Sequence, residues 1–337
     1  MYLKLFLFFI ILSPIAGISA QNKAYTTIGN PKANVYDICF SKGGTILVIP
    51  EHNDVRIFDA NTNQLLYTLT GGHSRPILTV DISADSTMLV TGGKDSAVVL
   101  WDLNQQKMLK KLYFHKGVIT SVKFHPEKNM VASASSDHTV ILYDIESDKI
   151  LHQLAQHQAD VSSLTFNSNG NILASGSEDK TVILWNTETG DIINQLKGHK
   201  DFIRTVSFSP DNSRLISGDD NSRAIIWKTE DPENVKLLDK TKIRLDWILS
   251  SSFHTDNKSY ILGGMNGWVK IITGFSDESY NMHKPVQKAL FIPNQGLYLK
   301  IAIATRGKGV VLIDTRYTKS KGVKSSRKKS ISNQIHF

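Results

Sequence analysis

Residues 157–199 read HQADVSSLTFNSNGNILASGSEDKTVILWNTETGDIINQLKGH, and this stretch decides the fold. It holds four short runs, at 161–166, 172–175, 181–185 and 192–196, bounded by Gly, Asn, Asp or Ser. Short runs that are rich in β-branched residues and lie between turn formers predict β-strands. The turns are too short for a helical crossover, so the four strands are expected to form an antiparallel meander.

The same unit recurs with a period of about 42 residues. The residues that end the third run of each unit are Phe58, Trp101, Tyr143, Trp185, Trp227, Ile272 and Ile313, at spacings of 43, 42, 42, 42, 45 and 41. Four units share a histidine 28 residues before that position: His73, His115, His157 and His199. A lone meander buries little apolar surface, so the units must pack on one another. Seven of them in a closed ring leave no long exposed edge, which predicts an all-β fold.

Two signatures within these units carry a family resemblance. Gly72-His73 is followed by Trp101-Asp102, and Gly198-His199 is followed by Trp227-Lys228. These pairs resemble the Gly-His and Trp-Asp signatures of WD-repeat β-propellers, and the resemblance covers about residues 23 to 314. It implies a seven-bladed β-propeller of four-stranded antiparallel blades. It also implies that a strand from the N-terminus, at Tyr25 to Ile28, closes the ring.

The resemblance further implies a hydrogen-bonded tetrad of His, Ser or Thr, Asp and Trp inside each well-formed blade. The matching positions are His73, Thr91, Asp95 and Trp101; His115, Ser133, Asp137 and Tyr143; His157, Ser175, Asp179 and Trp185; and His199, Ser217, Asn221 and Trp227. Tyr143 replaces Trp and Asn221 replaces Asp, so the third and fifth blades are expected to have weaker networks. Half-buried polar groups need such partners, because each unpaired group costs several kcal/mol.

A recurring Ser, His and Asp also resembles a hydrolase triad. Four copies at a fixed period indicate a structural device instead, because a catalytic triad occurs once and is built from unlike elements. No nucleophile elbow, zinc-binding helix, phosphate-binding Gly loop or Cys cluster is present in the sequence. We therefore predict a protein that is not an enzyme and that uses no metal and no cofactor.

The N-terminus has the pattern of an export signal. Lys4 precedes an unbroken apolar run at 5–12, and the small residues Ser19 and Ala20 precede Gln21. This predicts a secretory signal peptide at 1–20, with an uncleaved membrane anchor as the alternative. Cys39 is the only cysteine, so no intrachain disulfide can form even in an oxidising compartment. The expected location is the periplasm or cell envelope of a bacterium.

The net charge of +8 is concentrated at the two ends of the chain. Seven Lys or Arg residues and no acid follow Asp314, and Lys4 is the eighth excess base, so residues 21–314 are formally neutral. We predict a propeller domain at 21–316 and a basic, disordered tail at 317–337. The tail could instead contact an anionic surface. A neutral body argues against nucleic-acid binding.

The loops before each innermost strand indicate where a partner would bind. Phe202 and Trp247 occupy corresponding positions on neighbouring blades, and Arg75 and Asp160 belong to the same rim. Large aromatic side chains beside charges are typical of interface hot spots. The alternative is that both rings pack between blades.

Together these observations predict a non-catalytic protein-interaction scaffold of the cell envelope, a monomer within a complex. Two alternatives stay open. One is an exported propeller hydrolase or lyase that uses the central channel, and the other is an intracellular WD-repeat adaptor whose apolar start resembles a signal. The first alternative would need acids or histidines that converge on the channel.

Overall fold

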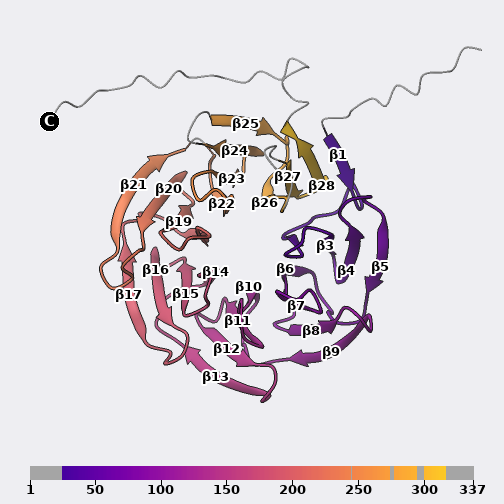
Figure 1. Cartoon of the computed structure of the whole chain (residues 1–337), viewed down its shortest axis with the longest axis horizontal. Coiled ribbons are helices and arrows are strands. Elements are labelled where there is room, and N and C mark those ends of the chain that lie inside the picture. Colours follow the sequence, from indigo (N-terminus) through magenta and orange to yellow (C-terminus); the bar gives the residue numbers. More distant parts are fainter. Residues whose placement is uncertain (1–24, 244, 274–276, 294–299, 316–337) are drawn as a thin grey trace, which may run out of the picture.

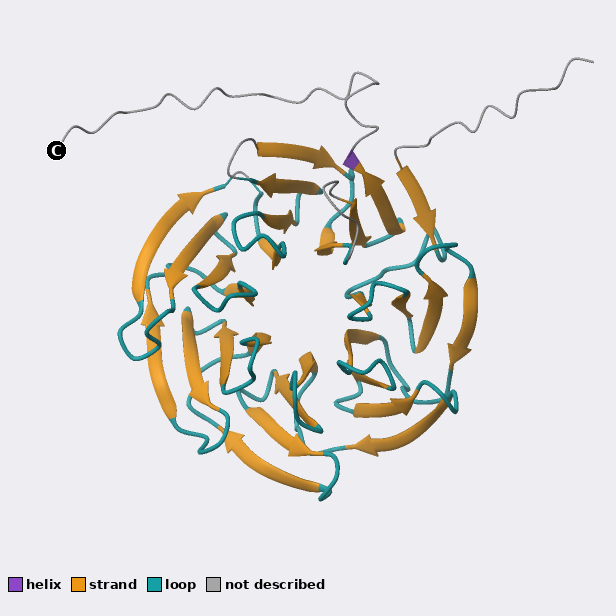
Figure 2. Ribbon diagram, viewed as in Figure 1, coloured by secondary structure: helices purple, strands orange, loops and turns teal. Residues whose placement is uncertain are grey.

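The structure is a computed structural model that describes residues 25–243, 245–273, 277–293 and 300–315. Its strands form seven four-stranded antiparallel sheets, arranged as blades in a ring (Figures 1 and 2). This confirms the predicted all-β, seven-bladed β-propeller. The predicted signal peptide, residues 1–20, and the predicted tail, residues 317–337, lie outside the described residues. Within the described ranges, no helix is long and apolar enough to cross a membrane.

The blades are numbered in chain order, and each is given from its innermost to its outermost strand. Blades one to three are β2 (Cys39–Phe40), β3 (Ile46–Glu51), β4 (Asp54–Asp59) and β5 (Leu65–Leu69); β6 (Ile77–Ile82), β7 (Met88–Gly93), β8 (Val98–Asp102) and β9 (Lys107–Leu112); and β10 (Ile119–Phe124), β11 (Met130–Ser135), β12 (Val140–Asp144) and β13 (Lys149–Leu154). Blades four and five are β14 (Val161–Phe166), β15 (Ile172–Ser177), β16 (Thr181–Asn186) and β17 (Ile192–Lys197); and β18 (Ile203–Phe208), β19 (Arg214–Asp219), β20 (Arg223–Lys228) and β21 (Lys236–Lys242). Blades six and seven are β22 (Ile248–Phe253), β23 (Tyr260–Gly264), β24 (Trp268–Ile272) and β25 (Asp277–Asn281); and β26 (Val286–Phe291), β27 (Lys300–Thr305), β28 (Gly309–Asp314) and β1 (Tyr25–Ile28).

The ring closes through blade seven, whose outermost strand comes from the other end of the chain. β1 pairs antiparallel with β28, from Tyr25 opposite Ile313 to Ile28 opposite Val310 (Figure 1). Ile28 is buried in the cluster between blades seven and one. The predicted closure by an N-terminal strand is therefore confirmed.

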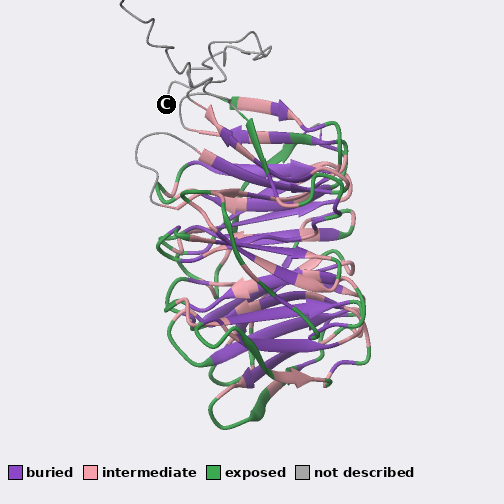
Figure 3. Ribbon diagram, turned by 90° about the vertical axis from the view of Figure 1, so that its right-hand side faces the viewer, coloured by how far each residue is buried: buried purple, intermediate pink, exposed green. Residues whose placement is uncertain are grey.

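The apolar core lies between neighbouring blades, as expected for units that cannot bury a face alone. One cluster of buried side chains fills each junction, and Figure 3 shows the buried strand segments stacked through the molecule. Second strands such as β15 are buried along their whole length, whereas the outermost strand β21 is exposed throughout. The three inner strands of each blade thus hold the surface loops in fixed positions.

One face of the ring carries the loops that contain the four repeated histidines and the turns that contain their aspartates. We call it the tetrad face. Each loop is tied to a turn by a backbone hydrogen bond, for example from the N–H of Asp220 to the carbonyl of Phe202 over 3.0 Å. The equivalent bond in blade six joins Met265 to Trp247. The side chains discussed below are therefore presented from a rigid frame.

Candidate functional site

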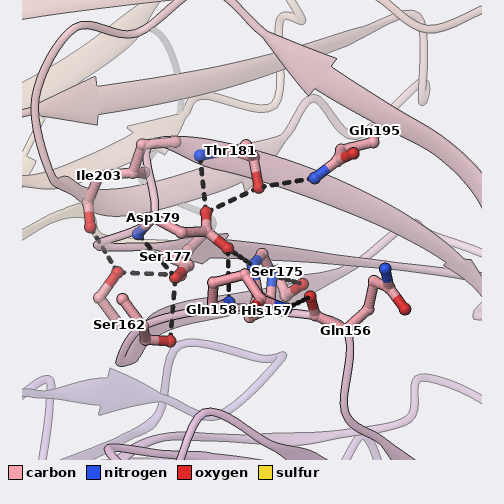
Figure 4. Close-up of polar contacts among 12 residues, drawn as sticks. Gln156, His157, Gln158, Ser162, Ser175, Ser177, Asp179, Thr181, Gln195 and Ile203 are labelled. Carbon is pink, nitrogen blue, oxygen red and sulfur yellow. Dashed lines mark hydrogen bonds and ion pairs between the residues drawn. The ribbon is translucent and has the colours of Figure 1, made fainter.

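The predicted tetrad of blade four forms one continuous hydrogen-bonded chain. His157 Nδ1 lies 2.6 Å from Asp179 Oδ2, and His157 Nε2 lies 2.7 Å from Ser175 Oγ (Figure 4). Trp185 Nε1 donates to the same serine oxygen over 2.8 Å. Blade two has the same chain through Trp101, Thr91, His73 and Asp95, with distances of 2.9, 2.8 and 2.9 Å.

The hydrogen-bond pattern in blade two fits a neutral imidazole. A carboxylate can only accept, so the proton between His73 and Asp95 is on Nδ1. Nε2 is then free to accept the hydroxyl proton of Thr91, whose oxygen accepts from Trp101. Burial lowers the pKa of His73, and the nearby carboxylate only partly offsets that effect.

In blade three the structure corrects the predicted fourth member. His115 contacts Ser133 and Asp137, each over 2.9 Å, but the hydroxyl of Tyr143 donates to Asp148 instead of Ser133. A phenol carries its oxygen at the tip of the ring, beyond the position where an indole holds its N–H. Burial opposes ionisation of Asp137, but hydrogen bonds from Thr139 and neighbouring groups outweigh it and lower its pKa to about 2.

In blade five the predicted Asn221 is not the partner of the histidine. His199 Nδ1 lies 2.7 Å from Asp219 Oδ2, and Nε2 lies 2.6 Å from Ser217 Oγ, which also accepts from Trp227. Asn221 contributes only its backbone N–H, which donates to Asp219 Oδ1 over 2.9 Å. A carboxylate is a stronger acceptor for an imidazole N–H than an amide is. Asp219 therefore completes the tetrad from two positions earlier.

The tetrads fasten loops to turns and are closed to other molecules. In blade four, the backbone N–H groups of Gln158 and Thr181 both donate to Asp179 (Figure 4). None of the four imidazoles is more than 1% exposed. A substrate could not reach these histidines, so their Ser-His-Asp pattern acts within the fold.

The exposed aromatic residues of the tetrad face surround an arginine. Phe202 and Trp247 are 38% and 44% exposed. The guanidinium carbon of Arg204 lies 5.6 Å from the centroid of the Phe202 ring and 5.5 Å from that of Trp247. Both distances suit cation–π contacts. We call these three residues the Arg204 stack. The rings are not buried between blades.

Two carboxylates hold the arginine in place. Arg204 Nε and Nη2 donate to Asp220 over 2.8 and 2.6 Å, and Nη1 donates to Glu178 of blade four over 2.5 Å. Burial disfavours the charged guanidinium, but these two acids outweigh burial and raise its pKa. The two acids fix the guanidinium, so both rings pack against a cation whose position is set.

The other two predicted partner residues, Asp160 and Arg75, lie in different places relative to the Arg204 stack. The carbonyl of Asp160 accepts from the N–H of Glu178, and its carboxylate lies 3.6 Å from His138 Nε2. Asp160 is thus adjacent to the Arg204 stack. Arg75 is exposed on blade two, and no described contact joins it to the stack. The structure therefore brings together Phe202, Trp247 and Asp160 but not Arg75.

A second set of residues, which the sequence interpretation missed, lines the central channel. In six junctions a side-chain oxygen on, or just before, the innermost strand of one blade accepts from a backbone N–H of the next blade. These oxygens belong to Asp37, Thr79, Ser121, Ser163, Thr205 and Ser250, at distances of 3.0 to 3.2 Å. At the seventh junction, Lys288 Nζ lies 3.5 Å from Asp37 Oδ1. We call these seven residues the channel ring.

The channel encloses a cavity of about 240 Å³ lined mainly by Ser, Thr and aliphatic residues. Four lining residues are charged and none is a histidine: Asp37, Lys123, Arg204 and Lys288. All four take part in ion pairs, Lys123 with Asp81 over 3.0 Å. Burial opposes the charge on Lys123, but the attraction of Asp81 and Asp37 raises its pKa.

Neither a metal cluster nor a reactive thiol appears in the described part of the chain. No group of three or more His, Cys, Asp or Glu side chains is placed there to hold a metal ion. Cys39 is buried in the core between blades one and two, and burial raises its pKa well above the usual value. A thiol held in its protonated form is a poor nucleophile.

A sequence signal did exist for the missed residues. Polar residues recur at the third position of the innermost strands of blades two to seven, and together with Asp37, two residues before β2, they form the channel ring. Arg204 stands at the second position, where the other blades have Tyr36, Leu78, Thr120, Ser162, Leu249 and Gln287. The one charged residue among these seven positions marks the part of the ring that departs from the repeat.

Comparison with known families agrees with this architecture. The model described as IFT140 first beta-propeller matches residues 114–244, and that described as WD domain, G-beta repeat matches residues 63–102. Both matches fall on blades that hold tetrads and on the strands that border them.

Individual relatives match over shorter segments. The chain is 43% identical over 51 residues to small ribosomal subunit protein RACK1y of Oryza sativa, covering 15% of each chain. It is 31% identical over 83 residues to guanine nucleotide-binding protein subunit beta of Schizosaccharomyces pombe, covering 25% of this chain and 26% of that one. It is 27% identical over 110 residues to U3 small nucleolar RNA-associated protein 12 of Saccharomyces cerevisiae, covering 27% and 12%.

These matches span about a quarter or less of the length of each relative. They concern the repeat and do not extend to any one relative as a whole. Taken with the seven blades and the tetrads, they identify the architecture as a WD-repeat β-propeller.

Proposed function

We propose that this protein is a non-catalytic scaffold of the cell envelope that holds a protein partner on its tetrad face, at the Arg204 stack. The observation that carries the proposal is that Phe202 and Trp247 are exposed yet pack against a guanidinium that two acids fix. Rigid aromatic side chains lose little conformational entropy on binding, which is why they dominate interface hot spots.

The surroundings of the stack suit a polar rim. Asp246 precedes Trp247 in the chain, the carbonyl of Asp160 accepts from the N–H of Glu178, and Lys180 Nζ lies 5.9 Å from the centroid of the Phe202 ring. A central pair of rings within a charged border is the usual arrangement of a transient interface. The Arg204 charge is already neutralised, so a partner that covers the stack would not bury an unpaired guanidinium.

The non-catalytic part of the proposal is supported by the channel. Its charged lining residues are held in ion pairs, and the described lining contains no histidine. A general acid or base needs a free group at the site of reaction. The tetrad histidines are closed to substrate.

The envelope location rests on the signal-peptide pattern at 1–20 and on the single cysteine. Cell fractionation tests it directly. Recovery of the protein with periplasmic markers, and an N-terminus that begins at Gln21, is the expected result. Recovery with cytoplasmic markers would favour the intracellular adaptor instead.

Site-specific photocrosslinking tests the proposed face. A photoreactive amino acid at Lys200, an exposed position beside Phe202, should give a discrete crosslinked band in the native host. The matched position is Lys107, exposed on the outermost strand β9 and remote from the stack. A band of equal intensity from both positions, or from Lys107 alone, would contradict the proposal.

A further inference from the structure

A second aromatic site lies on the tetrad face, across the ring from the Arg204 stack, and cations border it where carboxylates border the stack. Its tyrosine, Tyr36, is half-buried. The ring of Tyr36, in blade one, has Arg306 Cζ 5.2 Å and Lys94 Nζ 5.8 Å from its centroid. Arg306 belongs to blade seven and Lys94 to blade two, so two blades contribute cations to one tyrosine.

Two further cations border this tyrosine. The N–H of Lys94 donates to the carbonyl of Pro76, next to Arg75, and the N–H of Arg306 donates to that of Pro285, next to Lys284. All four cations are exposed. We call the group the Tyr36 patch: Tyr36, Arg75, Lys94, Lys284 and Arg306.

The four cations are not neutralised. Among the described residues, no carboxylate oxygen lies within 4.0 Å of their charged groups, in contrast to Arg204, which two acids hold. Of the acids in the same turns, Asp95 contacts His73 and lies 3.6 Å from Lys111 Nζ, and Glu51 of blade one pairs with Arg56.

An unsatisfied donor lies beside the patch. Gln287 follows Pro285 by two residues and lines the channel, as Tyr36 does. Its Nε2 is buried and has no hydrogen-bond acceptor among the described residues. Buried polar atoms without a partner are rare in native proteins and call for an explanation. Carboxylate oxygens would pair with the four cations and accept from the unused N–H.

We propose that the Tyr36 patch binds a short acidic segment, rich in Asp or Glu, of a partner protein. The cations are spread over blades seven, one and two, which suits several carboxylates along a peptide better than one phosphate, since a phosphate needs donors that converge. Nucleic acid fits less well. The cations already cover the ring on which a base would stack, and residues 21–314 are formally neutral.

The inference goes beyond the proposed function and does not depend on Phe202 or Trp247 binding anything. Its test measures the binding of a short fluorescein-labelled peptide, in which Glu alternates with Ser, to the purified protein. Fluorescence anisotropy reports this binding at low and at physiological salt. The wild type should bind, and more weakly as salt rises. The double variant Lys94→Glu, Arg306→Glu should raise the dissociation constant at least about tenfold.

Matched variants separate the patch from general charge effects. Lys107→Glu with Lys149→Glu makes the same charge change at exposed positions on β9 and β13, and should leave binding unchanged. If the first double variant fails to fold, Arg75→Glu with Lys284→Glu replaces it, because those side chains make no described contact. Phe202→Ala with Trp247→Ala should also bind the peptide normally.

Three results would overturn the inference. The first is no binding of the Glu peptide to the wild type at low salt. The second is an equal loss in the variant of β9 and β13. The third is tighter binding of another anion than of the Glu peptide, tested with a phosphoserine peptide and a single-stranded oligonucleotide of equal charge. It counts against the inference if only the Lys94, Arg306 variant loses the binding of that anion.

Discussion

Lys288 Nζ lies 3.5 Å from Asp37 Oδ1, and this ion pair joins the last blade to the first within the channel ring. At the other six junctions of the ring, a side-chain oxygen accepts from a backbone N–H. Asp37 also accepts from the N–H of Val80 and from the hydroxyl of Thr79, both in blade two. One carboxylate therefore connects three consecutive blades around the point where the ring closes.

Asp37→Ala should be the most destabilising substitution in the channel ring. It removes the carboxylate that contacts the Val80 N–H, the Thr79 hydroxyl and the Lys288 ammonium. The ammonium is then half-buried without its partner, at a cost of about 3 kcal/mol. The matched change Ser163→Ala removes one acceptor, that of the Val206 N–H, and should cost about 1 kcal/mol. Urea unfolding measures both, and equal losses would show that Asp37 has no special role in closure.

Removing β1 should open the ring. A chain that begins at Pro31 lacks the four residues that pair with β28 and loses buried Ile28. We expect its melting temperature to fall by roughly 5–10 °C relative to a chain that begins at Gln21. An unchanged melting temperature would mean that blade seven is stable with three strands.

Asp219→Asn should destabilise the protein by about 2 kcal/mol, because an amide cannot replace a buried carboxylate that accepts from His199 and from two backbone N–H groups. Asn221→Ala should cost less than about 0.5 kcal/mol, since no described contact involves its side chain. Thermal unfolding of the two variants compares them directly. A larger loss of stability for Asn221→Ala than for Asp219→Asn would show that Asn221 is a member of the tetrad.

Stability should decrease as the solution becomes acidic. Burial lowers the pKa of His73 and His115, so the unfolded chain, where histidine titrates near pH 6.5, binds protons first. Their contribution is complete above about pH 6.5 and is lost below it. Asp137, with a pKa of about 2, adds a further loss below about pH 4. Urea midpoints that stay constant between about pH 7.5 and pH 5.5 would contradict the neutral tetrads.

The repeat made most of the fold predictable. Because the period places equivalent residues at equivalent points of each blade, Trp101 and Trp185 located the third strands of their blades, and His73 and His157 located the loops. Closure by Tyr25 to Ile28 was predictable for a different reason. That β-branched segment was a better strand than the Lys-rich segment after Asp314.

The details that could not be predicted depend on how far each side chain extends within the blade. Spacing places Asn221 in the turn, but only the coordinates show that Asp219, at the end of β19, reaches His199 first. Spacing likewise places Tyr143 correctly in the blade, while the length of its ring decides that the hydroxyl contacts Asp148. The Arg204 stack joins blades five and six and is held by Glu178 of blade four, a relationship that a repeat within one blade does not encode.

Capture of partners from the native host, by crosslinking and affinity purification of a tagged chain, tests the central claim most directly. The variant Phe202→Ala, Trp247→Ala is compared with Leu65→Ala, Leu66→Ala, which removes apolar side chains that are 43% and 53% exposed on the outermost strand β5. We predict that the first variant keeps its melting temperature and loses an envelope protein that the wild type and the β5 variant retain. Equal recovery from all three proteins would contradict the assignment of the Arg204 stack as the binding site.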